Sequence, residues 1–336
     1  MRMSPSASTT SRAAAATRMP RWNPAEDKQL LKDVEKLAAN HRSGSTQLAL
    51  RACRILGALR PMTNAVPRRT YLRAAARAVA SSQPSMAAVW NTCHAWLRCV
   101  EAGGTPQAAA WQVARQLENA QQAVAARAAA LISRGCAVAT HSSSSTVLAA
   151  LLAATRQGRR FRLLCSEGRP QMEGRTLART LAAHRVPVDL LTDAGLLAAI
   201  SEADLALLGC DAIFPDGFLN KTGTAALVRL ARDHSVPVYV LADSFKFVPR
   251  RLAASILIRE EDPAEVWRTR QPLVRVRNFY FERVPLAGCT GVVTETGVWP
   301  PARAVHQVRR SEPASQTGLC SKPGRAPKMG EVCRCA

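Results

Sequence analysis

The sequence predicts an α/β protein in which a helical amino-terminal part precedes a parallel β-sheet. From about residue 24 to residue 130, apolar residues recur at helical spacing; from Gly135 onward, short apolar runs alternate with helix-like segments. Strand–helix alternation of this kind implies right-handed crossover connections and parallel strands. A chain of 336 residues is long enough for one large or two ordinary domains.

The helical part begins with an amphipathic pattern, in which Leu30, Val34 and Leu37 lie three or four residues apart. Ser43-Gly44-Ser45 interrupts this helix and offers a cap for the next, and Pro61 ends that second helix. Further helices are expected over residues 71–80, 86–100 and 107–132. We therefore assign residues 23–132 to a helical domain.

The α/β part contains five apolar runs that read as strands. They cover residues 136–140, 161–165, 186–191, 205–210 and 236–241. We assign residues 133–302 to this domain. Residues 303–336 are rich in Pro, Arg, Lys and Ser and are expected to form a disordered basic tail. Residues 1–22 have the composition of a transit peptide or of a disordered extension, and we favour the extension.

Composition restricts the class of protein. Lys and Arg number 46 against 24 Asp and Glu, a formal charge of +22, which permits a nucleic-acid partner. The arginines are dispersed, however, and aromatic residues are only 5%, few for stacking on bases. The ten cysteines form no paired CxxC pattern, and Cys320, Cys333 and Cys335 make no complete metal-ligand set. We expect a reduced, soluble, cytoplasmic protein with no metal, cofactor or membrane span.

A lone carboxylate, Asp211, follows the apolar run of residues 205–210. A residue at the carboxyl end of a parallel strand lies where open α/β sheets bind ligands. Asn220 and Lys221 then precede a second helical segment, and a helix start with a nearby lysine favours an anion. The sequence therefore predicts a site for a small molecule that bears phosphate.

Three other loops are expected at the same edge of the sheet. They add hydroxyl, imidazole and charged groups from Thr140, His141, Ser142, Ser143, Glu167, Arg169 and Lys246. These groups suit phosphate, and a carboxylate suits proton transfer or sugar hydroxyls. Simpler roles are open for each: the serines can cap a helix, His141 can be a core residue, Glu167 can pair with Arg169 on the surface, and Lys246 can be solvated.

Several consecutive motifs carry a resemblance to a known family. They are SGSTQLALRA (43–52), QPSMAAVWN (83–91), THSSSSTVL (140–148), SEGRPQMEGRTLA (166–178), GCDAIFPDGFLNKTGT (209–224), ADSFKF (242–247) and NFYFERVP (278–285). The chain resembles the translation initiation factor 2B alpha/beta/delta family, shared with ribose-1,5-bisphosphate isomerase and methylthioribose-1-phosphate isomerase. The resemblance implies a helical domain on a Rossmann-like α/β domain, with homodimers formed through the latter.

The resemblance also implies which residues would be catalytic. The isomerases use a cysteine after a Thr-His pair and the aspartate of a Gly-x-Asp-Ala motif. Asp211 matches the aspartate, but Ser142 stands at the cysteine position, and a serine hydroxyl is a poor substitute for a thiol. Cys210 is an alternative thiol, although neighbouring strand residues point to opposite faces.

A second departure concerns phosphate binding. The isomerases carry an Arg-Gly-Ala motif near the amino terminus, and the corresponding stretch here is Ser43-Gly44-Ser45. We therefore expect a non-catalytic regulatory or assembly subunit that binds a sugar phosphate or nucleotide, with Ser43 and Gly44 beside the ligand. Related subunits or translation factors are further expected partners. The alternative is an active aldose–ketose isomerase.

Overall fold

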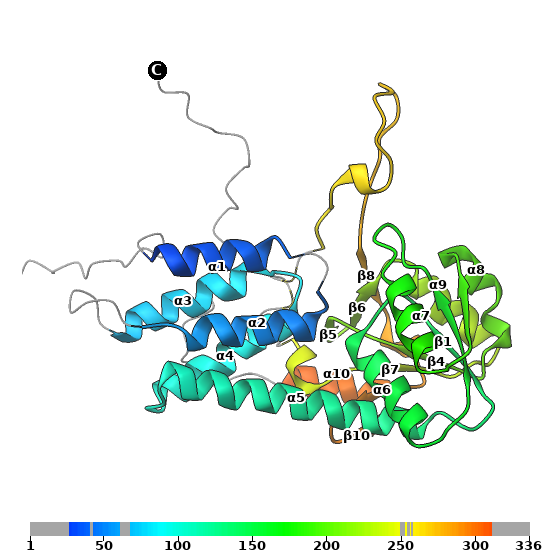
Figure 1. Ribbon diagram of the computed structural model, residues 1–336, viewed down its shortest axis with the longest axis horizontal. Coiled ribbons are helices and arrows are strands. Elements are labelled where there is room, and N and C mark those ends of the chain that lie inside the picture. The colour runs from blue at the N-terminus through cyan, green and yellow to red at the C-terminus, as the bar shows by residue number, and fades with distance from the viewer. Residues whose placement is uncertain are drawn as a thin grey trace, which may run out of the picture.

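The computed structural model describes residues 27–40, 43–60, 68–248, 253, 256 and 258–310. The expectations for residues 1–22 and for the tail beyond residue 310 lie outside these residues. Figure 1 shows a helical half beside an α/β half, with α5 running along both. The predicted fold class is confirmed.

The helical half contains five helices within the described residues: α1 (Lys28–Ala38), α2 (Ser45–Gly57), α3 (Arg68–Ser82), α4 (Ala87–Glu101) and α5 (Pro106–Ala130). Local signals set two of the starts, because the side chains of Asp27 and Thr105 cap α1 and α5. Trp96 is fully buried in this half, and its indole N–H donates to the carbonyl of Pro106. The apolar spacing in the sequence therefore located these helices correctly.

The α/β half is built on a seven-stranded sheet in the described part of the chain. Its strands, in spatial order, are β10 (Gly297–Trp299), β9 (Gly291–Thr294), β7 (Val238–Leu241), β4 (Leu205–Leu208), β1 (Ala137–Thr140), β2 (Arg162–Ser166) and β3 (Val188–Leu191). All neighbours are parallel except β9 and β10. The chain leaves β1 in one direction and returns at β4 to build the other half, so the topological switch lies between β1 and β4.

Helices cover both faces of this sheet. On one face α5 and α6 (Ser145–Arg156) share an apolar core with α7 (Gly174–Ala183), in which Val124 and Ile132 pack with Val138 and Leu207. On the other face α8 (Asp193–Ala198), α9 (Thr224–Asp233) and α10 (Pro301–Arg310) supply a second core. Because α5 contributes to the cores of both halves, it joins them into one packed body.

A small antiparallel sheet, absent from the sequence prediction, lies after β4. Its strands are β5 (Ala212–Phe214), β6 (Gly217–Lys221) and β8 (Phe281–Val284). Asn220 and Lys221 therefore end a strand, and the helix expected after them, α9, starts at Thr224 with Gly223 rather than Asn220 as its N-cap. The cause is long-range: β6 is stabilised by pairing with β8, which local sequence spacing does not reveal.

The carboxyl-terminal boundary also differs from the expectation. Residues 303–310 were expected to be disordered, but they belong to α10, whose Ala304 and Val308 are fully buried. The basic composition of this stretch concealed two apolar positions four residues apart, which is the spacing of one helix face. None of the helices in the described ranges is long and apolar enough to span a membrane.

Candidate functional site

The site lies at the carboxyl edge of the parallel sheet, where the loops after β1 and β4 meet. Gly209 brings these two loops into close contact, because a Cβ at this position would lie 2.5 Å from Cβ of Ser144. Ser144 in turn caps α6 through its side chain. The switch between β1 and β4 is thus a tightly packed junction.

Thr140 and His141 are held by bonds within the protein. The hydroxyl of Thr140 donates to the carbonyl of Leu207 at 2.8 Å. His141 is buried, with Nε2 2.9 Å from the carbonyl of Thr222 and Nδ1 2.7 Å from Oγ of Ser166. A carbonyl only accepts, so Nε2 carries the proton in this arrangement. Both residues therefore connect neighbouring segments at the ends of the strands. For His141 this is the simpler, structural role that the sequence left open.

Ser142 and Lys221 converge on one carboxylate oxygen. Oγ of Ser142 donates to Oε1 of Glu173 at 2.6 Å, and Nζ of Lys221 lies 2.8 Å from the same oxygen. Lys221 is buried, and the ring of Tyr280 lies 4.8 Å from its ammonium. Ser142 has a left-handed backbone with φ of 66°. The predicted site residues Ser142 and Lys221 are therefore brought together, by a residue that sequence reasoning did not select.

Asp211 and Lys246 form a second polar group beside the first. Burial raises the pKa of Asp211, while Lys246, the hydroxyl of Ser45 and Lys221 lower it. Lys246 is buried rather than solvated. Its ammonium interacts electrostatically with Asp211 and with the fully buried Asp243. Ser45 belongs to the first turn of α2, so the helical domain contributes directly to this site.

Cys210 adjoins this group but has no thiolate character. Strand β4 ends at Leu208, so the alternation of a strand does not decide where its side chain points. The thiol lies 3.7 Å from the carbonyl of Leu241, and burial raises the pKa of Cys210 to about 12. A protonated, buried thiol is a poor nucleophile.

The remaining predicted residues lie around this centre with other partners. Glu167 pairs with Arg175 at 2.8 Å and not with Arg169, which is exposed. Asn220 donates to Oγ1 of Thr224. Ser143 and Gly44 are exposed and Ser43 is half-buried.

Backbone amides expected to receive an anion are already bonded to carboxylates of the chain. Glu282 accepts from the amides of Gly223 and Ala225 at the start of α9. Asp193 accepts from the amides of Gly168 and Arg169. Sequence reasoning missed these acids and Glu173 because the groups that they bind are distant in the chain. The position of Glu173 before α7 was the one available signal, since acids are common at helix starts.

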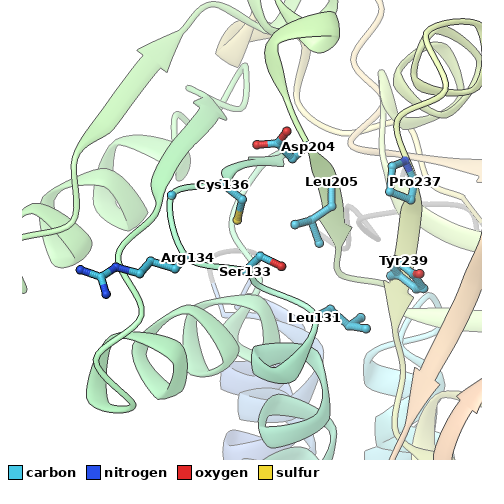
Figure 2. A pocket seen from close by; sticks show the side chains of 9 residues that line it. Leu131, Ser133, Arg134, Cys136, Asp204, Leu205, Pro237 and Tyr239 are labelled. Carbon is cyan, nitrogen blue, oxygen red and sulfur yellow. The ribbon is translucent and has the colours of Figure 1, made fainter.

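A separate cavity of about 500 Å³ lies at the opposite, amino-terminal edge of the sheet (Figure 2). Its lining includes Cys136, Asp204, Leu205 and Tyr239, with Arg134 and Ser133 at its exposed rim. It shares no residue with the predicted site. Among the described residues, no group of three or more His, Cys, Asp or Glu is placed to hold a metal ion.

Comparison with known proteins points to one family. The sequence model of the initiation factor 2 subunit family matches residues 34–301. A translation initiation factor eIF-2B subunit 2-like protein of Pyrococcus horikoshii is 31% identical over 228 residues, which cover 68% of this chain and 80% of the relative. Ribose 1,5-bisphosphate isomerase of Haloterrigena turkmenica is 30% identical over 262 residues, 71% of this chain and 79% of the relative.

Solved structures share the fold. The crystal structure of translation initiation factor eIF-2B from Pyrococcus horikoshii has a TM-score of 0.73 at 27% identity, covering 83% of this chain and 99% of that one. A 5-methylthioribose 1-phosphate isomerase of the same organism has a TM-score of 0.65 at 20% identity, covering 83% and 87%. Factor subunits and isomerases thus match similarly, and likeness alone does not separate the two roles.

Proposed function

The chain belongs to the initiation factor 2 subunit family, and within it we propose that it is a non-catalytic regulatory or assembly subunit that binds a sugar phosphate or nucleotide. The observation that carries this proposal is the pairing of Ser142 with Glu173. Ser142 stands at the position that resembles the catalytic cysteine of the isomerases, and its hydroxyl is bonded at 2.6 Å to a carboxylate that also holds Lys221. That arrangement supplies no thiolate.

The other cysteine near the site does not replace the missing one. The thiol of Cys210 is buried and protonated, with its sulfur against the carbonyl of Leu241. Activation of a thiol requires a lowered pKa or an adjacent base, whereas burial raises the pKa of this one. The chemistry of the site therefore favours binding over turnover.

Ligand binding is supported by the charged groups that remain. Asp211, Lys221 and Lys246 lie at the carboxyl edge of the sheet, where the switch between β1 and β4 places ligands in open α/β folds. Lysines suit phosphate, and a carboxylate suits the hydroxyls of a ribose. Both sugar phosphates and nucleotides present these groups.

Assays with the purified chain test the proposal. With ribose 1,5-bisphosphate or 5-methylthioribose 1-phosphate we expect no isomerisation, and a rise in melting temperature on addition of a sugar phosphate. Lys221→Ala should remove that rise. Turnover that Asp211→Asn abolishes would refute the non-catalytic role, and the absence of any shift with sugar phosphates and nucleotides would refute the ligand site.

The second candidate is an active sugar-phosphate isomerase, and one observation favours it. Burial raises the pKa of Asp211, and a carboxyl that keeps its proton to higher pH is suited to acid catalysis. Ser142→Cys separates the two roles: turnover in this variant but not in the wild type would show that the thiol alone is missing.

We further propose that the chain forms homodimers through its α/β domain and assembles with related subunits or translation factors. A structural relative from Chaetomium thermophilum is a tetrameric eIF2B-beta2-delta2 complex, with a TM-score of 0.60 at 18% identity. Sedimentation of the purified chain tests the dimer, and a monomer at micromolar concentration would contradict it.

A further inference from the structure

Groups of this chain that could bind an anion are already bonded to its own carboxylates. Glu282 and Asp193 accept hydrogen bonds from backbone amides. Glu173 pairs with the ammonium of Lys221, 2.8 Å away. Lys221 is 5% exposed, and it forms an ion pair with Glu173. The charge that a phosphate would need is thus already neutralised by the protein.

Glu173 is not fully satisfied in this position. Its Oε1 receives both Ser142 and Lys221, but its Oε2 is buried and has no hydrogen-bond partner within the described residues. A buried carboxylate oxygen without a donor carries a desolvation penalty. This penalty offsets part of the stabilisation that the ion pair with Lys221 provides. A ligand therefore displaces this carboxylate more easily than one with both oxygens bonded.

Glu173 lies partly at the surface. The side chain of Glu173 is 25% exposed, so one side of it faces solvent. On its other side the carboxylate packs directly against Gly168, because a Cβ at this position would lie only 3.0 Å from the carboxyl carbon of Glu173. Movement towards solvent would free Lys221 and the hydroxyl of Ser142 together.

From these contacts we infer that Glu173 determines the specificity of the site, by competing with the phosphate group of a ligand for Lys221. A phosphate oxygen and the Glu173 carboxylate cannot both occupy the position beside the ammonium of Lys221. Two anions bound next to each other there would also repel. A sugar phosphate or inorganic phosphate binds only when Glu173 gives up its bond to Lys221. This inference rests on the proposed ligand site and adds the residue that controls its affinity for anions.

Calorimetric titration of the full chain with ribose 5-phosphate, and separately with inorganic phosphate, tests the inference. Glu173→Gln keeps an oxygen for Ser142 and Lys221 but removes the charge. We expect it to bind both anions at least about tenfold more tightly than the wild type, since the loss of one like charge near a partly solvated pair is of this order. Neutral ribose should bind wild type and variant alike.

Glu202→Gln is the matched control. Glu202 is exposed and pairs with Arg162, away from the candidate site, so this variant should bind as the wild type does. Should Glu173→Gln fail to fold by circular dichroism, Glu173→Ala replaces it, with the same expected gain. Equal or weaker anion binding by the folded variant would overturn the role of Glu173 and leave the ligand site standing. No binding of either anion by any variant would overturn both.

Discussion

The hydroxyl of Ser45, in the first turn of α2, lowers the pKa of Asp211, which follows β4. One residue comes from the helical half and the other from the α/β half. The hydroxyl stabilises the charged form of a carboxyl whose burial favours the neutral form. Both halves of the chain therefore contribute to the candidate site.

Ser45→Ala should destabilise the folded protein. The substitution removes the hydroxyl that stabilises the charged form of the half-buried Asp211, so we expect a loss of about 1–2 kcal/mol in the free energy of unfolding. Urea denaturation measures it. Gln47→Ala, at an exposed position of the same helix, should cost far less; equal losses in the two variants would contradict the role given to Ser45.

His141→Ala should cost about 2–4 kcal/mol, because it opens a cavity and leaves Ser166 and the carbonyl of Thr222 without partners. The structure shows His141 bonded to both. Chemical denaturation of the variant gives the value, with His234→Ala at an exposed helix end as the control. A wild-type stability for His141→Ala would exclude its fastening role.

Asp243→Asn should change how stability depends on pH. Burial raises the pKa of Asp243 above its ordinary 3.8, so the folded state holds a proton that the unfolded state releases. The wild type therefore loses stability as pH rises from 3.8 towards the raised pKa, and the asparagine variant lacks this loss.

The measurable quantity is the difference in unfolding free energy between the variant and the wild type. It should grow from about pH 4 upward and then level off. Asp233→Asn, which changes an exposed carboxylate on α9, should show no such trend. A difference that is flat with pH would contradict the burial argument.

Gly209→Ala should destabilise the junction between β1 and β4 by about 2 kcal/mol, because the new methyl group meets Ser144 at 2.5 Å. Ser144→Gly removes the obstructing atoms and on its own should cost only a few tenths of a kcal/mol at a helix cap. The double variant should therefore recover most of the loss. Simple additivity of the two losses would show that these residues do not contact each other.

The sequence predicted most of the fold because the apolar residues that form its cores recur at regular spacing along the chain. Leu30 and Leu37 are buried on one face of α1, and the apolar residues of β1, β2 and β4 are buried. The edge at which Asp211, Ser142 and Lys221 gather also followed from parallel strands. Such features depend on neighbours close in the chain, which a sequence displays.

The features that were missed depend on distant partners. Strand β6 pairs with β8, and Glu173 reaches Lys221 from another loop. No local spacing distinguishes Glu173 from an ordinary acid before a helix. Likewise, the sequence left open whether Lys246 binds phosphate or is solvated, and it did not reveal that the lysine is buried beside Asp211 and Asp243.

The pairing of β6 with β8 has a further consequence for how the chain can vary. Lys221, the last residue of β6, lies opposite Phe281, the first residue of β8, and is held there by that pairing. The chain that leads into β8, residues 258–279, projects from the body as the yellow-to-orange arm of Figure 1, where Leu273 is 99% exposed. The two ends of this arm are joined by a hydrogen bond from the amide of Glu261 to the carbonyl of Asn278. Lengthening a loop whose ends are already tied adds little entropy cost. Insertions and deletions in this arm can therefore accumulate during evolution while the lysine stays in place.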